Sequence, residues 1–181
     1  MTDKTLSRVR EICEVSGVTM KNEIVVFGST YMKKFPFYEF LSKCRMENAV
    51  YNHSIEDLSL RDAQEVLTEC VLNAEPSKVF LCLGENEYEK EDSVALYGQI
   101  VTRIRTELPR AKIYLIELKE KGAERFNDEI KKMCDGKHVF CIKFATGGDS
   151  KLETYKEQFK QMSCFFRDKL MLSDAFAIAN L

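Results

Sequence analysis

Short apolar runs alternate along this chain with longer segments in which apolar residues recur every three or four positions. The runs are hydrophobic at consecutive positions, which is typical of strands that are buried on both faces of a parallel sheet. We therefore predict five strands, at residues 23–28, 49–52, 78–84, 112–118 and 138–145.

The segments between these runs have the 3.6-residue period of amphipathic helices. Strands and helices in alternation predict a three-layer α/β/α sandwich with a five-stranded parallel sheet, flavodoxin-like in its layout. The predicted helices span residues 36–45, 59–73, 91–108, 122–134 and 152–170, and one more, residues 4–15, precedes the first strand.

The chain has 181 residues and contains no linker, internal repeat or low-complexity stretch. We therefore expect residues 1–181 to form a single α/β domain. The last segment, residues 171–181, is apolar. This tail either packs on its own domain or joins two copies into a homodimer, and in the second case its removal would abolish association.

Charge and composition argue against two classes of partner. The 27 Lys and Arg residues are balanced by 29 Asp and Glu residues, which leaves a net charge of -2. Such a chain has no excess of positive charge to attract phosphate groups, so we expect no nucleic-acid partner. No stretch is long and apolar enough to span a bilayer, and the N-terminus lacks the apolar core of a signal peptide. We expect a cytoplasmic protein without a membrane partner.

Seven cysteines, an odd number, fit the reducing cytoplasm, where we expect them to be buried thiols. The stretch "CDGKHVFC" places Cys134, His138 and Cys141 close together in sequence. It lacks a fourth ligand and straddles a helix end and a strand, so we expect no metal. No Gly-rich phosphate loop follows any strand, so we also expect no cofactor.

Small and polar residues follow the first three predicted strands. In an open parallel sheet, ligands bind at the carboxyl ends of the strands, so these residues are the candidates for a site. They are Gly28, Ser29 and Thr30 after the first strand, Asn52, His53 and Asp57 after the second, and Gly84, Asn86 and Glu87 after the third.

In order and spacing, the three blocks resemble the SGNH (GDSL-type) hydrolases, a family of esterases, lipases and acyl hydrolases. In that family the first strand ends in Gly-Asp-Ser, and the serine is the nucleophile. An Asn-x-x-x-x-Gly block and a Gly-x-Asn-Asp block supply the oxyanion hole, and a late Asp-x-x-His supplies the acid and the base. The resemblance covers about residues 23–145, and "PSKVFLCLGENE" is its most specific part. It implies an SGNH-like fold and a small-molecule ester or carbohydrate-like ligand.

Carried over by position, the match to this family is partial. Gly28, Asn52, Gly84 and Asn86 agree with the family blocks. Ser29 stands where the family has Asp, and Thr30 stands where it has the nucleophilic Ser. Asp57 replaces a glycine, and Glu87 replaces an aspartate. The late block is missing, because Leu152 stands three residues after Asp149 where the family has its histidine.

A hydroxyl nucleophile needs a base, and only two histidines are present. His138 opens the fifth predicted strand, at the edge of the sheet away from the three loops. His53 lies at the correct edge and is either the base or a surface histidine. Ser29 and Thr30 are either nucleophiles or loop residues that hydrogen-bond their own backbone. Asn86 either donates to a ligand oxygen or caps a turn or helix.

The acidic loop residues Glu56, Asp57, Glu85 and Glu87 are either solvated or gathered at the mouth of a pocket. If they gather, they would favour cationic or polar neutral ligands. The sequence thus supports an SGNH-like protein that has lost efficient hydrolysis and keeps a polar pocket. An active ester or acyl hydrolase, with Thr30 or Ser29 as nucleophile, is the first alternative, and a homodimeric interaction protein is the second.

Overall fold

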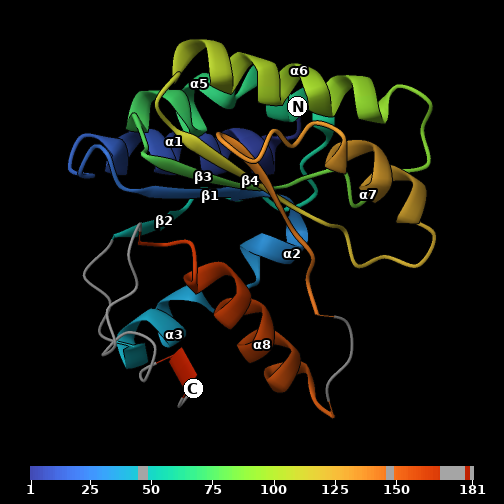
Figure 1. Ribbon diagram of the computed structural model, residues 1–181. Helices are drawn as coiled ribbons and strands as arrows, with labels where there is room; N and C mark the ends of the chain where they lie inside the picture. The colour runs from blue at the N-terminus through green and yellow to red at the C-terminus, as the bar shows by residue number, and fades with distance from the viewer. Residues whose placement is uncertain (45–48, 146–148, 168–177, 180–181) are drawn as a thin grey trace.

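Five parallel strands form one sheet at the centre of the molecule, in the order β2-β1-β3-β4-β5. The computed structural model describes residues 1–44, 49–145, 149–167 and 178–179 (Figure 1). The strands are β1 (Ile24–Gly28), β2 (Val50–Asn52), β3 (Lys78–Cys82), β4 (Lys112–Ile116) and β5 (Val139–Ile142). Their order and direction confirm the predicted three-layer fold with a five-stranded parallel sheet.

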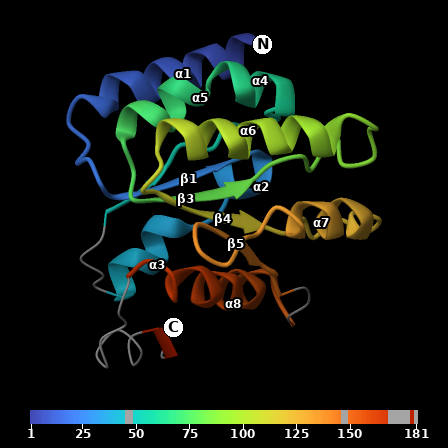
Figure 2. The same ribbon diagram turned by 45° about the horizontal axis from the view of Figure 1, so that its top comes forward.

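Helices cover both faces of the sheet. One face carries α1 (Asp3–Ser16), α4 (Leu60–Glu65), α5 (Leu67–Cys70) and α6 (Ser93–Glu107), and the other carries α3 (Phe37–Cys44) and α8 (Lys151–Ser163) (Figures 1 and 2). The remaining helices are α2 (Thr30–Lys33), which follows β1, α7 (Glu124–Lys131), which contacts α6, and the 3-10 helix η1 (Leu72–Ala74).

Side-chain caps define where several helices begin. The Thr2 hydroxyl accepts a hydrogen bond from the Thr5 backbone at α1. The Ser59 and Ser150 hydroxyls cap α4 and α8 in the same way. Such a cap satisfies one of the backbone N–H groups that a helix leaves free at its start, and it stabilises the helix by about 1 kcal/mol.

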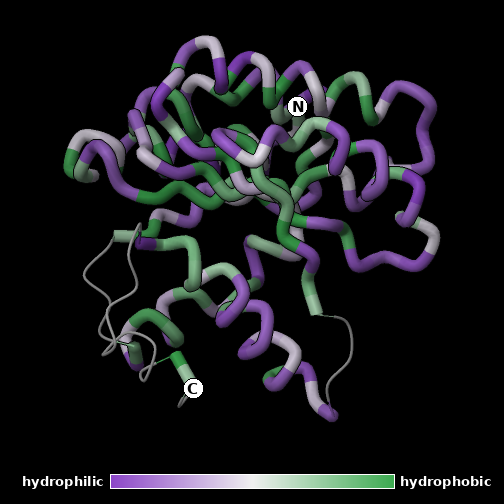
Figure 3. Tube along the Cα trace, in the orientation of Figure 1, coloured by the Kyte–Doolittle hydropathy of each residue, from purple (hydrophilic) through white to green (hydrophobic). Residues whose placement is uncertain are grey.

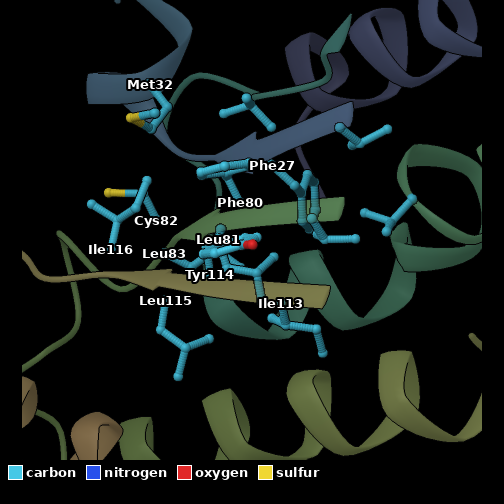
Figure 4. Close-up of a cluster of buried hydrophobic side chains, with 14 of the residues drawn as sticks. Phe27, Met32, Phe80, Leu81, Cys82, Leu83, Ile113, Tyr114, Leu115 and Ile116 are labelled. Carbon is cyan, nitrogen blue, oxygen red and sulfur yellow. The ribbon is translucent and has the colours of Figure 1, made fainter. Parts of the chain in front are cut away.

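The core is made from strands that are buried on both faces. Every residue of β1 and β3 is buried, as the consecutive apolar positions predicted. Figure 4 shows the side chains of Phe27, Phe80 and Tyr114 within this core, and the rings of Phe80 and Tyr114 stack with their centroids 4.6 Å apart. Figure 3 shows the hydrophobic colour along the central strands and more hydrophilic residues on the outer helix surfaces.

The prediction of one continuous helix over residues 59–73 is wrong. The backbone leaves helical geometry at Val66 and again at Val71, which separates α4, α5 and η1. Both are buried β-branched residues with low helix propensity, so core packing sets their backbone. The break frees the Gln64 carbonyl, and Arg103 of α6 donates to it at 3.2 Å.

Two further observations concern the short helix α2 and the C-terminal tail. The single turn of α2 directly after β1 escaped prediction, because four residues are too few to show a helical period. Most of the apolar tail, residues 171–181, lies outside the described residues; within it, Ile178 is buried. In the described part of the chain, no helix is both long enough and apolar enough to cross a membrane.

Candidate functional site

Close packing at the end of β1 leaves no room for a side chain at Gly28. A Cβ atom at this position would lie 2.7 Å from the Cys82 carbonyl oxygen and 2.8 Å from the Met32 side chain. The lack of a side chain therefore allows β1, β3 and the first turn of α2 to approach one another closely. This glycine positions the loop that follows it.

Ser29 is enclosed by protein. Its side chain is fully buried, and its hydroxyl has no hydrogen-bond partner among the described residues. Its backbone N–H donates to the Cys82 carbonyl at 3.2 Å, which ties the loop to β3. In this conformation the Ser29 hydroxyl is not open to a substrate.

Thr30 is half-buried at the start of α2 and is held by Asp57. The Thr30 hydroxyl accepts a hydrogen bond from the Asp57 backbone N–H at 2.9 Å. It donates to the Asp57 carboxylate at 3.1 Å. The N–H that would serve an oxyanion hole is thus occupied, and a carboxylate lies beside it, where negative charge would develop during acyl transfer.

Asp57 adopts a backbone conformation that favours glycine. Its φ angle is +55°, in a turn after β2, where the SGNH pattern has a glycine. Aspartate tolerates this region better than most residues because its short side chain hydrogen-bonds locally. Here the Asp57 carboxylate instead accepts a hydrogen bond from Thr30, which is distant in sequence.

His53 lies away from Thr30, and the expectation of a surface histidine is wrong. Its side chain is buried, and its Nδ1 atom lies 2.6 Å from the Cys70 carbonyl oxygen of α5. A carbonyl only accepts, so Nδ1 carries the proton and Nε2 carries the lone pair. Burial lowers the pKa of His53, and the nearby Arg8 guanidinium lowers it further.

The free energy of unfolding is expected to fall as the pH drops below about 6.5. Folded His53 has the lower pKa, so the unfolded state takes up this proton first. The slope reaches at most about 1.4 kcal/mol per pH unit for one proton. Urea unfolding of wild type and His53→Asn between pH 5 and 7.5 tests this, because asparagine can keep a bond to Cys70 without titrating. Equal pH dependence in the two proteins would contradict it.

Asn52 is a structural residue in this fold. Its side-chain amide donates to the Met32 carbonyl at 2.8 Å, and its side-chain oxygen accepts from the Ser54 backbone at 3.1 Å. The side chain therefore joins α2 to the loop after β2 and is almost completely buried.

In the block after β3, two of the candidate residues have structural contacts and the third is exposed. Gly84 has a φ angle of +97°, and Phe126 packs against it. Glu87 accepts from the Leu60 backbone N–H at 2.6 Å and thereby caps α4. Asn86 is exposed and makes no hydrogen bond with another described residue. Of the two candidate asparagines, Asn86 is the exposed one and Asn52 the buried, hydrogen-bonded one.

The acidic residues of these loops are engaged by the protein itself. Glu56 pairs with Lys34 at 2.7 Å, and this partner lowers the pKa of Glu56. Glu85 accepts from the Tyr31 backbone N–H. Glu87 pairs with Lys90 at 2.7 Å in addition to its capping bond. These carboxylates therefore bind groups of the protein itself, and they do not gather around the mouth of one pocket.

Sequence reasoning missed the cluster around Tyr31. The Tyr31 hydroxyl donates to the Gln158 side chain of α8, and the Lys119 ammonium lies 3.5 Å from the centre of the Tyr31 ring. Burial raises the pKa of Tyr31 and lowers that of Lys119. No local motif reveals this cluster, because its members come from three distant parts of the chain.

A hollow of about 780 Å³ lies near the carboxyl ends of the strands, between the loop after β3 and the start of α7. Its walls combine aromatic and charged side chains of both signs. They include Tyr88, Lys90, Glu91, Arg125, Phe126 and Glu129. The volume falls in the range of small-molecule sites.

The remaining sequence candidates are Asp149 and the residues of the stretch "CDGKHVFC". Asp149 is exposed just before α8, and residues 146–148 lie outside the described residues. All seven cysteines are free thiols, but the expectation that they are buried holds only for Cys44, Cys70 and Cys82, because Cys13 and Cys164 are exposed and the other two are half-buried. In the described part of the chain, no three His, Cys, Asp or Glu residues are arranged to hold a metal.

The chain has an SGNH (GDSL-type) hydrolase-like α/β fold, as its motifs predicted. A protein from Streptococcus pneumoniae assigned as a platelet activating factor superposes with a TM-score of 0.75 at 13% identity, over 91% of this chain and 93% of that one. A GDSL-like lipase from Bacteroides thetaiotaomicron superposes with a TM-score of 0.61 at 10% identity, over 96% and 94%.

A third solved structure agrees with these two. A protein from Bacteroides fragilis assigned as an acylhydrolase superposes with a TM-score of 0.65 at 9% identity, over 82% of this chain and 83% of that one. No family model and no curated protein matches the sequence. At these identities the likeness concerns the fold alone.

Proposed function

We propose that this protein is an SGNH-like protein without efficient hydrolysis, which binds a polar small molecule at the carboxyl edge of its sheet. The observation that carries the proposal is the pairing of Thr30 with Asp57. It occupies both the hydroxyl at the nucleophile position and the N–H that an oxyanion would need. A hydroxyl in this state lacks an imidazole base, because His53 is bound to the Cys70 carbonyl.

The polar hollow near Tyr88 and Arg125 supports the binding part of the proposal. Its wall residues follow β3 and β4, at the edge where open parallel sheets bind ligands. Two of the neighbouring structures named above are a GDSL-like lipase and a protein assigned as an acylhydrolase, so a small ester or a carbohydrate-like compound is the ligand class to test first. Seven free cysteines support a reducing compartment such as the cytoplasm.

Active ester hydrolysis is the second candidate, and one contact favours it. The Asp57 carboxylate lies 3.1 Å from the Thr30 hydroxyl oxygen and could take its proton directly. A carboxylate is a weaker base than imidazole at neutral pH, so such an enzyme would be slow. The same carboxylate would also oppose the developing oxyanion.

Hydrolysis of a short-chain aryl ester by the purified protein distinguishes the two candidates. We expect a rate no higher than that of a non-enzymatic control protein, and no change in Thr30→Ala, Ser29→Ala, His53→Ala or Asp57→Asn. Saturable turnover that is lost in both Thr30→Ala and Asp57→Asn would instead establish a Thr30 nucleophile with an Asp57 base. Asparagine at position 57 tolerates the positive φ angle, so this variant removes the charge and keeps the turn.

A further inference from the structure

The two cysteines of the stretch "CDGKHVFC" lie next to each other in the fold, although they belong to different elements. Cys134 follows the end of α7, and Cys141 lies in β5. Their thiols are within hydrogen-bonding reach of each other. Both side chains are half-buried, so a small reagent can reach them. Two accessible thiols in contact are the starting arrangement for an intramolecular disulfide.

Asp135 holds the turn that brings the two cysteines together. One oxygen of its carboxylate accepts hydrogen bonds, at 2.7 to 2.8 Å, from three backbone N–H groups, those of Lys137, His138 and Val139. The Val139 carbonyl in turn accepts from the Asp135 N–H at 3.1 Å. The turn thus fixes Cys134, directly before it, relative to Cys141, which shares a face of β5 with Val139. Reacting groups that are held in this way react much faster than the same groups free in solution.

The surroundings of the two thiols give them different reactivities. Burial raises the pKa of Cys141 to about 12, and the neighbouring Cys134 and Glu117 contribute to this rise. The Cys141 thiol also donates to the Glu117 carboxylate at 3.8 Å. Burial raises the pKa of Cys134 as well, but there the contact with Cys141 acts in the opposite direction and lowers it. Because the thiolate is the nucleophile, Cys134 is the thiol that reacts first.

We propose that Cys134 and Cys141 form a redox-sensitive dithiol, which a small disulfide of the glutathione type oxidises to an intramolecular disulfide. The Cys134 thiolate attacks one sulfur of glutathione disulfide, so that a mixed disulfide forms and one glutathione thiolate leaves. The Cys141 thiolate then attacks the Cys134 sulfur, and the second glutathione thiolate leaves. The protein loses two thiols, the reagent is reduced to two thiols, and the two protons pass through solvent to the leaving thiolates.

This dithiol is independent of the function proposed above, because it requires neither hydrolysis nor a bound ligand. It is compatible with a reducing compartment, since disulfides of cytosolic proteins are usually transient and redox-sensing. The raised pKa of both thiols makes the thiolate rare at neutral pH, so oxidation should be slow and should depend on the contact between the two sulfurs.

The experiment exposes the reduced full-length protein to glutathione disulfide, blocks the remaining thiols with N-ethylmaleimide and maps the cysteines by mass spectrometry after trypsin digestion. Cleavage after Lys137 places Cys134 and Cys141 on separate peptides, so only a disulfide joins them. We expect the joined peptides as the main product, with the loss of two free thiols per chain. The exposed Cys13 and Cys164 should carry at most a mixed disulfide with glutathione. Joined peptides that are absent, or that form only in urea, would overturn the proposal.

Serine variants test the order of the two steps. Cys141→Ser lacks the second thiol, so Cys134 should stop at the mixed disulfide with glutathione. Cys134→Ser lacks the first thiol, so glutathione should be incorporated at Cys141 at least about tenfold more slowly than at Cys134 in Cys141→Ser.

The control for these variants is Cys164→Ser. It removes an exposed thiol that donates to the Lys160 carbonyl, and it should give the joined peptides at the rate of the wild type. Equal amounts of mixed disulfide at Cys134 in the wild type and in Cys141→Ser would show that Cys141 does not react with it, and would refute the proposed pair.

Discussion

Replacing Gly28 with alanine is expected to lower the free energy of unfolding by about 3 kcal/mol. The new Cβ would lie 2.7 Å from the Cys82 carbonyl oxygen, and backbone in the middle of a sheet cannot move aside cheaply. For a chain of this size, the melting temperature should fall by roughly 6 to 12 °C. Urea unfolding and calorimetry measure both effects.

Two other glycines provide matched controls for this variant. A Cβ at Gly17 meets no atom within 4 Å, and its φ angle is -65°, so Gly17→Ala should change stability by less than about 0.5 kcal/mol. Gly136 also has open space but a φ angle of +67°, so Gly136→Ala should cost about 1 to 2 kcal/mol through backbone strain. A Gly28→Ala variant as stable as Gly17→Ala would show that β1 and β3 are less closely packed than described.

Asn52→Ala is expected to destabilise the protein by about 3 kcal/mol, because two buried backbone groups lose their partners. The Met32 carbonyl would lose its bond at 2.8 Å, and the Ser54 N–H would lose its bond at 3.1 Å. Both residues are fully buried, so water cannot replace the lost bonds easily. Equilibrium unfolding in urea measures the change.

Asn86→Ala is the control, since the motif contains both asparagines but the structure uses only one. Asn86 is exposed and bonds to no other described residue, so its replacement should alter stability by less than about 0.5 kcal/mol. If Asn86→Ala proved as harmful as Asn52→Ala, Asn86 would hold the loop after β3 together, and its role as an open ligand contact would be lost.

Much of the fold could be predicted from sequence because the strands are apolar on consecutive positions. Residues such as Val25, Val26 and Phe27 are buried on both faces, and only a covered parallel sheet provides that environment. The break at Val66 could not be predicted, because apolar periodicity continues through it. The carbonyl that the break frees finds its partner, Arg103, on a different helix.

The positions of the candidate residues along the sheet could be predicted from sequence, but the directions of their side chains could not. The residues after β1, β2 and β3 were placed correctly at one edge of the sheet, since parallel strands end there together. The direction of a side chain depends on tertiary neighbours that no local pattern contains. His53 points to Cys70 and Asn52 points to Met32, although Asn52 ends β2 and His53 follows it, as expected. The hydrogen bond between Thr30 and Asp57 joins residues that are 27 positions apart in sequence, so no periodic pattern reveals it.

The bond between Tyr31 and Gln158 has a consequence for the order of folding. The two residues are 127 positions apart in sequence, and the bond joins the turn after the first strand to the last long helix. Contacts of such separation form late, because the entropy of closing the intervening chain must be overcome first. During synthesis from the N-terminus, the loop with Ser29 and Thr30 leaves the ribosome long before α8 does. This edge of the sheet therefore reaches its final form only after α8 has been made.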